Sequence, residues 1–145
     1  MQKKEEKFSS RNDSRTNDLK EQLTKLSEGL FYISETDSPI EVFEVVGTHE
    51  LSAKEILKQT GHALSEPIEE VSFESFFGRL TTIREWYGDF EKLRAGRFGE
   101  LKQKLATSLG EPRVFRIGKI RIDIYVVGFD ENRNVLGIRT KAVET

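Results

Sequence analysis

Few residues in this 145-residue chain could do catalytic chemistry. The chain has no cysteine, which excludes disulfides, thiol catalysis and thiolate metal sites. Its two histidines, His49 and His62, stand in loop-like settings, and a histidine after Gly61 is typical of a helix-ending cap. There is no HExxH, Walker, GxSxG or Rossmann glycine pattern, and no spacing of acids singles out an acid/base pair. We therefore expect no enzymatic activity.

Three features favour a binding surface instead. Glu35 lies in an acidic loop. Glu85 and Trp86 are adjacent, and an aromatic side chain beside acids in a loop is a typical interaction anchor. Thr145 follows directly after a predicted strand, which would hold its hydroxyl and its terminal carboxylate in a defined place. Taken alone, the same features also fit a solvated turn, a buried tryptophan and a frayed end.

The elements nearest Thr145 are the best defined. Apolar and polar residues alternate, which is the period of a half-buried strand, at Ile120, Ile122, Ile124 and Val126. After a turn at residues 130–134, a second run places one face at Leu136, Ile138, Thr140 and Ala142. The opposite face is polar, with Lys119, Arg121, Asp123, Tyr125, Arg139 and Lys141. Any layer that covers this polar face must be partial or use polar contacts.

Helical periodicity dominates the first half of the chain. Leucines recur at helical spacing at Leu19, Leu23, Leu26 and Leu30. Asp18 resembles a cap for this helix, and Gly29 is a suitable stop. A loop at residues 34–39 and a strand at residues 40–46 follow. Ser52 and Ser72 each predict the start of a short helix.

A longer helix is indicated before the final strands. Its apolar positions are Leu93, Phe98, Leu101, Leu105 and Leu109. Gly96 and Gly99 weaken its first half by about 1 kcal/mol each, which predicts a late start or a break. Gly110 and Pro112 end it. The order of elements predicts an α+β fold with a mostly antiparallel sheet of about four strands.

Composition and charge along the chain indicate its domain organisation and limit the classes of function. Residues 1–16 are polar and carry two more basic than acidic side chains, with only Phe8 as an apolar anchor. We expect a disordered or frayed N-terminal extension, followed by a single domain over residues 17–145. A net charge of −2 argues against a dedicated nucleic-acid binder. Since there is neither a membrane-length apolar run nor a secretory signal, we expect a soluble, cytoplasmic protein.

Short motifs run through most of the length. They are Glu28-Gly-Leu-Phe31, Ser34-Glu35, Glu41-Val-Phe43, Gln59-Thr-Gly-His62, Ser75-Phe-Phe-Gly-Arg79, Thr81-Thr82, Trp86-Tyr87, Val114-Phe-Arg-Ile-Gly118, Asp123-Ile-Tyr-Val-Val-Gly128, Asn134-Val-Leu-Gly-Ile138 and Thr140-Lys-Ala-Val-Glu-Thr145. On these motifs, residues 19–145 resemble the nuclease A inhibitor family, small bacterial proteins that block sugar-non-specific nucleases. The motifs belong to no common superfamily, so the match is specific.

The resemblance implies both a fold and a function. The fold would be a three-layer α-β-α sandwich, similar in outline to plant pathogenesis-related proteins of class 1. The partner would be a ββα-metal nuclease with a histidine base and Mg²⁺ or Mn²⁺, bound 1:1 by a monomeric inhibitor. No cofactor, direct nucleic-acid contact or membrane contact is implied for the inhibitor itself.

The resemblance also implies four contact residues. Thr145 would enter the nuclease active site and reach its metal, and Glu35, Glu85 and Trp86 would touch the enzyme. At position 85 the family pattern has aspartate, so this chain departs from it by one methylene. The alternative is an interaction module of the same fold with a different protein partner.

Overall fold

The structure is a computed structural model that describes residues 2–45 and 50–145, with side chains from residue 14 onward. The elements are α1 (Gln2–Ser27), β1 (Phe31–Ile33), β2 (Asp37–Pro39), β3 (Glu41–Val45), α2 (Ala53–Gln59), β4 (Ile68–Val71), α3 (Phe73–Thr81), α4 (Asp89–Ser108), β5 (Gly110–Ile117), β6 (Arg121–Phe129) and β7 (Val135–Val143). His49 and Val46 lie outside the described residues, and so does the side chain of Phe8.

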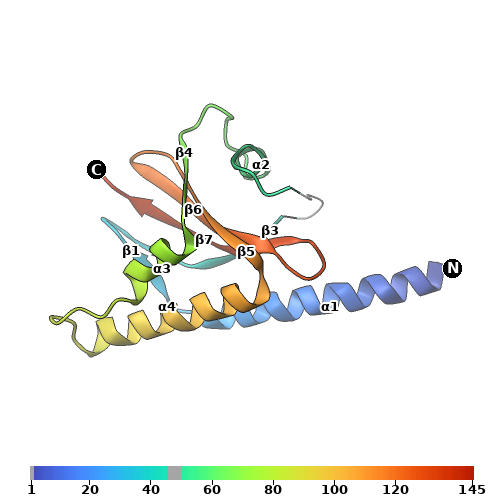
Figure 1. The fold of residues 1–145 in the computed structure, drawn as a ribbon, viewed down its shortest axis with the longest axis horizontal. Coiled ribbons are helices and arrows are strands. Elements are labelled where there is room, and N and C mark those ends of the chain that lie inside the picture. The colour runs from blue at the N-terminus through green and yellow to red at the C-terminus, as the bar shows by residue number, and fades with distance from the viewer. Residues whose placement is uncertain (1, 46–49) are drawn as a thin grey trace.

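A five-stranded sheet is the centre of the fold (Figure 1). Its strand order is β3-β7-β6-β5-β4, and every neighbouring pair is antiparallel. The predicted α+β class is confirmed. The sheet has one strand more than expected because β4 escaped prediction. Its residues 68–71 place two adjacent acids in the middle of the strand, and this breaks the alternation by which a half-buried strand is recognised.

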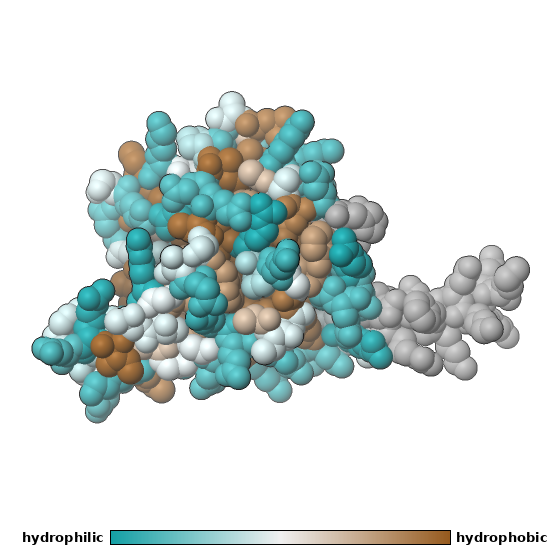
Figure 2. Space-filling view, viewed as in Figure 1, coloured by the Kyte–Doolittle hydropathy of each residue, from teal (hydrophilic) through white to brown (hydrophobic). Residues whose placement is uncertain are grey.

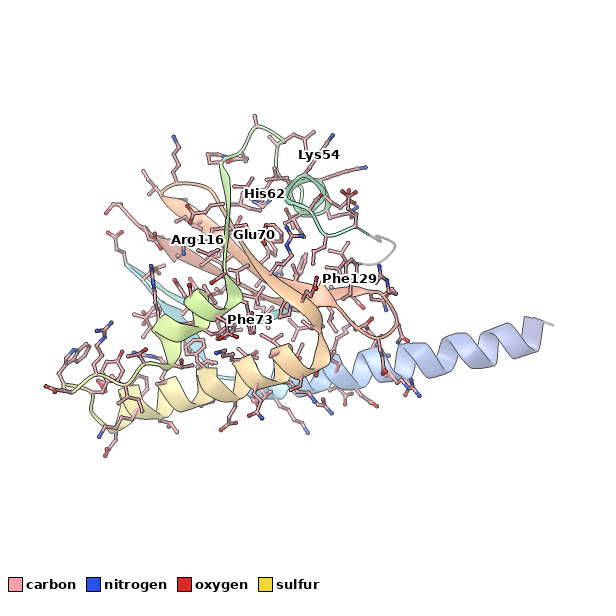
Figure 3. The ribbon with its side chains drawn as sticks, in the orientation of Figure 1. Lys54, His62, Glu70, Phe73, Arg116 and Phe129 are labelled. Atoms are coloured by element: carbon pink, nitrogen blue, oxygen red, sulfur yellow. The ribbon has the colours of Figure 1, made fainter. Side chains whose placement is uncertain are left out.

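Alternation along β5 and β6 gives the sheet two apolar faces. Val114, Ile124 and Val126 belong to a core shared with α1, α3 and α4. Phe115 and Val127 face the other way and pack with α2. In Figure 3, Phe73 lies on the α3 side of the sheet and His62 on the α2 side.

The expectation that the second face of the last two strands is polar was therefore partly wrong. Tyr125 and Val127 on that face are buried, because α2 covers them. Asp123 is half-buried, whereas Arg139 and Lys141 are exposed as expected. On the core face, Leu136, Ile138, Thr140 and Ala142 are buried, as the alternation predicted. Ile120 is the exception, because it precedes β6 and is exposed.

The acidic loop is a small hairpin. β1 pairs with β2 in antiparallel register, Phe31 opposite Pro39 and Ile33 opposite Asp37. The expectation of a plain loop at residues 34–39 was wrong because strands of three residues are too short to show periodicity. The Thr140 hydroxyl donates to the Pro39 carbonyl at 3.0 Å, which ties the hairpin to β7.

Helix α4 begins at Asp89 and is unbroken, contrary to the expected late start. Asp89 and Glu91 in its first turn interact favourably with the helix dipole, and packing of the buried Phe98 and Leu101 outweighs the cost of the two glycines. Helices α1 and α4 run side by side in opposite directions (Figure 1). The Arg97 guanidinium of α4 donates to the Leu26 and Glu28 carbonyls, and so caps the end of α1.

Helix α1 continues back to Gln2 through the polar N-terminal segment, so its predicted start at Asp18 was wrong. Leu23 and Leu30 are buried, and Leu19 and Leu26 pack beside them, as their spacing predicted. The domain boundary at residue 17 stays a prediction. No helix among the described residues is both long and apolar enough to cross a membrane.

One buried polar cluster joins α1 to the turn between β6 and β7. The Thr16 hydroxyl donates to Asp130 Oδ2 at 3.0 Å, and both residues are buried. Asp130 Oδ1 accepts the backbone N–H groups of Asn132 and Asn134, each at 2.9 Å. This single carboxylate therefore shapes the predicted turn at residues 130–134 and fixes the first helix against it.

Candidate functional site

Two of the four predicted contact residues meet at the surface. The Thr145 hydroxyl donates to Glu35 Oε1 at 2.6 Å, and the Thr145 backbone N–H donates to Glu35 Oε2. Both residues are exposed, although 110 positions separate them in the chain. The alternative of a frayed end does not fit this pairing. We call Glu35, Glu144 and Thr145 the terminal cluster.

The hairpin β1–β2 positions Glu35. Its tip is a tight turn in which the Ser34 N–H donates to the Thr36 carbonyl at 2.9 Å. This tip is bonded to the end of β7 in both directions. The Val143 N–H donates to the Ser34 hydroxyl oxygen at 3.0 Å, and the Glu35 N–H donates to the Val143 carbonyl at 3.2 Å. Glu35 and Thr145 therefore extend from one bonded unit.

Arg116 of β5 positions Glu144, and the sequence reasoning missed it. Its guanidinium donates to Glu144 Oε2 at 2.6 Å, and its Nε lies 4.0 Å from a Glu69 carboxylate oxygen. The Arg116 side chain is only 16% exposed. The Glu144 backbone is held separately, since its N–H donates to the Ile120 carbonyl at 2.9 Å. The one signal in the sequence was a lone charge inside the apolar alternation of residues 114–117.

Hydrogen bonding from Thr145 sets the electrostatics of the terminal cluster. The Thr145 hydroxyl, and to a smaller extent the Thr145 N–H, lowers the pKa of the Glu35 carboxyl below its ordinary value. Glu35 is therefore a carboxylate at neutral pH. Because the Thr145 hydroxyl gives its one proton to Glu35, its lone pairs remain free. The cluster presents hard oxygen atoms, which are the ligands that Mg²⁺ and Mn²⁺ prefer.

Glu85 and Trp86 lie apart from the terminal cluster. Both are exposed, and the hydrogen bonds of Glu35 among the described residues go to Thr145 and to Val143 at the end of β7. The Trp86 ring is 73% exposed and meets the half-buried Tyr87 ring edge-on, with centroids 4.7 Å apart. The alternative of a buried tryptophan is therefore wrong. The contact with a partner stays a prediction.

Trp86 belongs to a larger exposed group that the sequence reasoning missed. Ile83, Phe90 and Leu93 are exposed by 59%, 70% and 66%. With Trp86 they form what we call the apolar patch, between the end of α3 and the first turns of α4. Figure 2 shows hydrophobic side chains at the surface where α4 begins. Leu93 is one of the apolar positions from which this helix was predicted. Its helical spacing fits, but the first turn of α4 extends past the elements that bury Phe98.

His62 takes a structural position. Its Nε2 lies 2.8 Å from Asp123 Oδ2, and its Nδ1 lies 2.6 Å from the Thr60 hydroxyl oxygen. The Thr60 hydroxyl oxygen also lies 2.7 Å from the Ile56 carbonyl oxygen within α2. This trio joins the end of α2 to β6, beside a pocket of about 450 Å³. The interpretation of His62 as a cap-like residue agrees with these contacts.

Metal-ligand geometry is not found among the described residues: no group of three or more His, Cys, Asp or Glu side chains is arranged to hold an ion. The candidate site is therefore an exposed set of oxygen atoms plus a separate apolar patch, on an α+β scaffold.

A comparison with known families gives the particular class. The family model described as Nuclease A inhibitor-like protein matches residues 17–145, and the chain belongs to that family. No curated protein matches the chain closely enough to add a relative.

Proposed function

We propose that this protein inhibits a metal-dependent, sugar-non-specific nuclease of the ββα-metal type by occluding its active site with Thr145. The family membership supports a nuclease as the partner. The observation that carries the mechanism is the pairing of Glu35 with Thr145, which holds a carboxylate and a hydroxyl oxygen together at the surface.

The chemistry of such a nuclease explains why these groups would bind. Its metal ion accepts phosphate oxygens, and its groove is basic so that it can hold the nucleic-acid backbone. The oxygens of Thr145 would reach the ion, and the Glu35 carboxylate would take the place of a phosphate. A net charge of −2 favours approach to a basic groove. The ion, Mg²⁺ or Mn²⁺, belongs to the nuclease, and the inhibitor contributes no cofactor and forms no covalent bond.

Glu85 and Trp86 would form a second contact. An exposed tryptophan fixed edge-on by Tyr87 is a rigid anchor that loses little entropy on binding. In Figure 1 the C-terminus and the connection between α3 and α4 lie toward the same end of the long axis. One partner could therefore touch both in a 1:1 complex.

The finer description of the fold is also part of this proposal. Apolar clusters on both faces of the sheet, one with α1, α3 and α4 and one with α2, support a three-layer α-β-α sandwich. Likeness to plant pathogenesis-related proteins of class 1 and a bacterial source remain expectations of the resemblance. A cytoplasmic location remains an expectation from the sequence alone.

The test is nuclease inhibition with matched variants at one position. Thr145→Val keeps the shape of the side chain and removes its hydroxyl, and Thr145→Ser keeps the hydroxyl. Purified protein should inhibit a ββα-metal nuclease in Mg²⁺ at equimolar ratio, Thr145→Ser should inhibit similarly, and Thr145→Val or deletion of Thr145 should not. Equal inhibition by all four proteins would refute the proposed role of Thr145.

The alternative is an interaction module of the same fold with a different protein partner, and the exposed apolar patch would be its contact surface. It predicts that the protein leaves ββα-metal nucleases active and captures an unrelated protein through the apolar patch. Affinity capture distinguishes the two by the identity of the captured protein, and loss of that protein from Trp86→Ala shows that its capture is specific.

A further inference from the structure

Two exposed isoleucines flank the terminal cluster. Ile33 ends β1, two residues before Glu35, and its side chain is 46% exposed. Ile120 accepts the Glu144 N–H on its carbonyl and is 56% exposed. Two separate segments of the chain therefore each place an exposed isoleucine next to the terminal cluster, one by two residues of sequence and one by a backbone hydrogen bond.

The hairpin continues this apolar surface. Tyr32 faces the body of the protein, where its ring stacks on Phe76 with centroids 5.8 Å apart. Since side chains alternate along a strand, Phe31 and Ile33 face away from the body. Pro39, opposite Phe31 on β2, is also exposed. This outward face makes no contribution to either core cluster.

Exposed apolar side chains are not scattered over the described surface. Apart from Leu64, every large hydrophobic residue that is exposed there belongs to the apolar patch or to the three positions Phe31, Ile33 and Ile120. Figure 1 places β1, the C-terminus and the start of α4 toward the same end. Concentration of this kind marks an interaction surface, whereas single exposed residues require no explanation.

We propose that Phe31, Ile33 and Ile120 form an apolar rim that seals the terminal cluster against the nuclease. The inference rests on the proposed function and extends it. A carboxylate and a metal ion attract each other weakly when water surrounds them and more strongly when water is excluded. The rim would exclude this water. The partner surface that it fits is a cation-binding cleft whose border carries apolar side chains.

The experiment compares equal substitutions at equally exposed positions. Ile33→Ser and Ile120→Ser remove rim side chains, and Leu64→Ser is the control because Leu64 is 60% exposed and lies outside both apolar surfaces. Affinity for a Mg²⁺-loaded ββα-metal nuclease is measured by calorimetry, and dissociation rates by surface plasmon resonance. Each rim variant should bind about 5–20-fold more weakly, mainly through faster dissociation, and Leu64→Ser should match the wild type. Thermal melting checks that all variants fold.

A double-mutant cycle tests the sealing mechanism. If the rim acts by drying the Thr145 contact, Ile33→Ser should cost less affinity in the Thr145→Val background than in the wild type. Wild-type protein that fails to bind the nuclease overturns both proposals. Wild-type binding that Thr145→Val weakens, together with rim variants indistinguishable from Leu64→Ser, overturns the rim alone.

Discussion

The terminal cluster and the apolar patch solve the problem of presenting a binding surface in opposite ways. In the terminal cluster, the Thr145 hydroxyl, the Thr145 N–H and the Glu144 N–H all have partners within the protein. In the apolar patch, the Tyr87 N–H bond to the Arg84 carbonyl closes one turn, and the large side chains around it are exposed. Charged oxygens need fixed geometry, whereas apolar area does not.

The two regions also differ in the step at which their side chains lose conformational entropy. Side chains in the terminal cluster are ordered on folding, so binding costs them little further entropy. Phe90 and Leu93 are largely exposed, and immobilising each on a partner costs about 0.5–1.5 kcal/mol. Substitutions in the terminal cluster should therefore cause large losses of binding affinity, even when they change the geometry only slightly. Substitutions in the apolar patch should cause smaller losses, and side chains of another shape should be tolerated there.

Among the residues other than Thr145, the largest effect is expected at Glu35. Glu35→Gln keeps one acceptor oxygen but removes the charge that receives both hydrogen bonds from Thr145. Because these charge-assisted hydrogen bonds fix the direction of Thr145, inhibition should weaken about 10–100-fold. The measurement is the inhibition constant. Asp37→Asn, an equal loss of charge on the same exposed hairpin, is the control and should change it less than about 3-fold. Similar losses for both variants would contradict a specific role for Glu35.

Arg116 comes next, as a positioning residue. Arg116→Gln removes the cation between Glu144 and Glu69, so these two carboxylates repel and the direction of Thr145 is less defined. We expect about 10-fold weaker inhibition, with partial rescue by Arg116→Lys, which keeps the charge but lacks the planar fork.

A purely structural role for Arg116 would behave differently. The Arg116→Gln effect should disappear when Thr145 is deleted, because nothing is left to position. If the variant weakens inhibition equally with and without Thr145, Arg116 supports the fold alone.

Substitutions in the apolar patch should weaken nuclease binding less than those at Glu35 and Arg116. Trp86→Ala should weaken nuclease binding by more than about 1 kcal/mol and leave the melting temperature nearly unchanged, because the ring is 73% exposed. Calorimetry and thermal melting measure the two quantities. A marked fall in melting temperature would place the ring in a structural role that its exposure does not indicate.

Acid titration of Glu35 tests the hydrogen bonds of the terminal cluster alone, since the apolar patch takes no part in it. Since the pKa of Glu35 is lowered from 4.5, its hydrogen bonds to Thr145 are fully present above that pH and are lost as the pH falls through the lowered pKa. Thr145→Val removes the larger cause and should move the pKa of Glu35 back up toward 4.5. NMR titration of the Glu35 carboxyl carbon measures this, with Thr36→Val as a neighbouring control. An unchanged pKa in Thr145→Val would show that the hydroxyl bond does not form in solution.

The smallest effect is expected at Glu85. Glu85→Asp restores the family residue and shortens an exposed side chain by one methylene. Binding to the usual nuclease of the family should be unchanged or slightly tighter by calorimetry. Clearly weaker binding would mean that the longer glutamate suits the partner of this protein.

The parts of the fold that could be predicted from sequence depend on neighbours along the chain. Ser52 and Ser72 cap α2 and α3 as their spacing indicated, because each bonds to an N–H three residues on. The turn at residues 130–134 is likewise shaped by its own Asp130. Residue types near Thr145 and Trp86 indicated these two as contact candidates, and the family resemblance was needed to prefer that interpretation over a frayed end and a buried tryptophan.

What escaped prediction depends on distant partners. The role of Arg116 depends on its hydrogen bond to Glu144, 28 residues away in the sequence. Strand β4 is held at the sheet edge by two hydrogen bonds from Arg113 to Glu70, at 2.6 and 2.8 Å. The pKa of Glu70 is lowered chiefly by these hydrogen bonds from Arg113. No local pattern reveals such pairings. For the same reason the sequence could suggest Glu35 and Thr145 separately but could not show that they touch.

The bond between Thr16 and Asp130 has a practical meaning for anyone who shortens this protein. A fragment cut to the recognisable family region would start at residue 17 and lose the hydroxyl donor to a buried carboxylate. An unsatisfied buried acceptor costs about 1–3 kcal/mol, a large share of the stability of a small domain. A stable truncated protein should therefore begin before residue 17, so that Thr16 is retained.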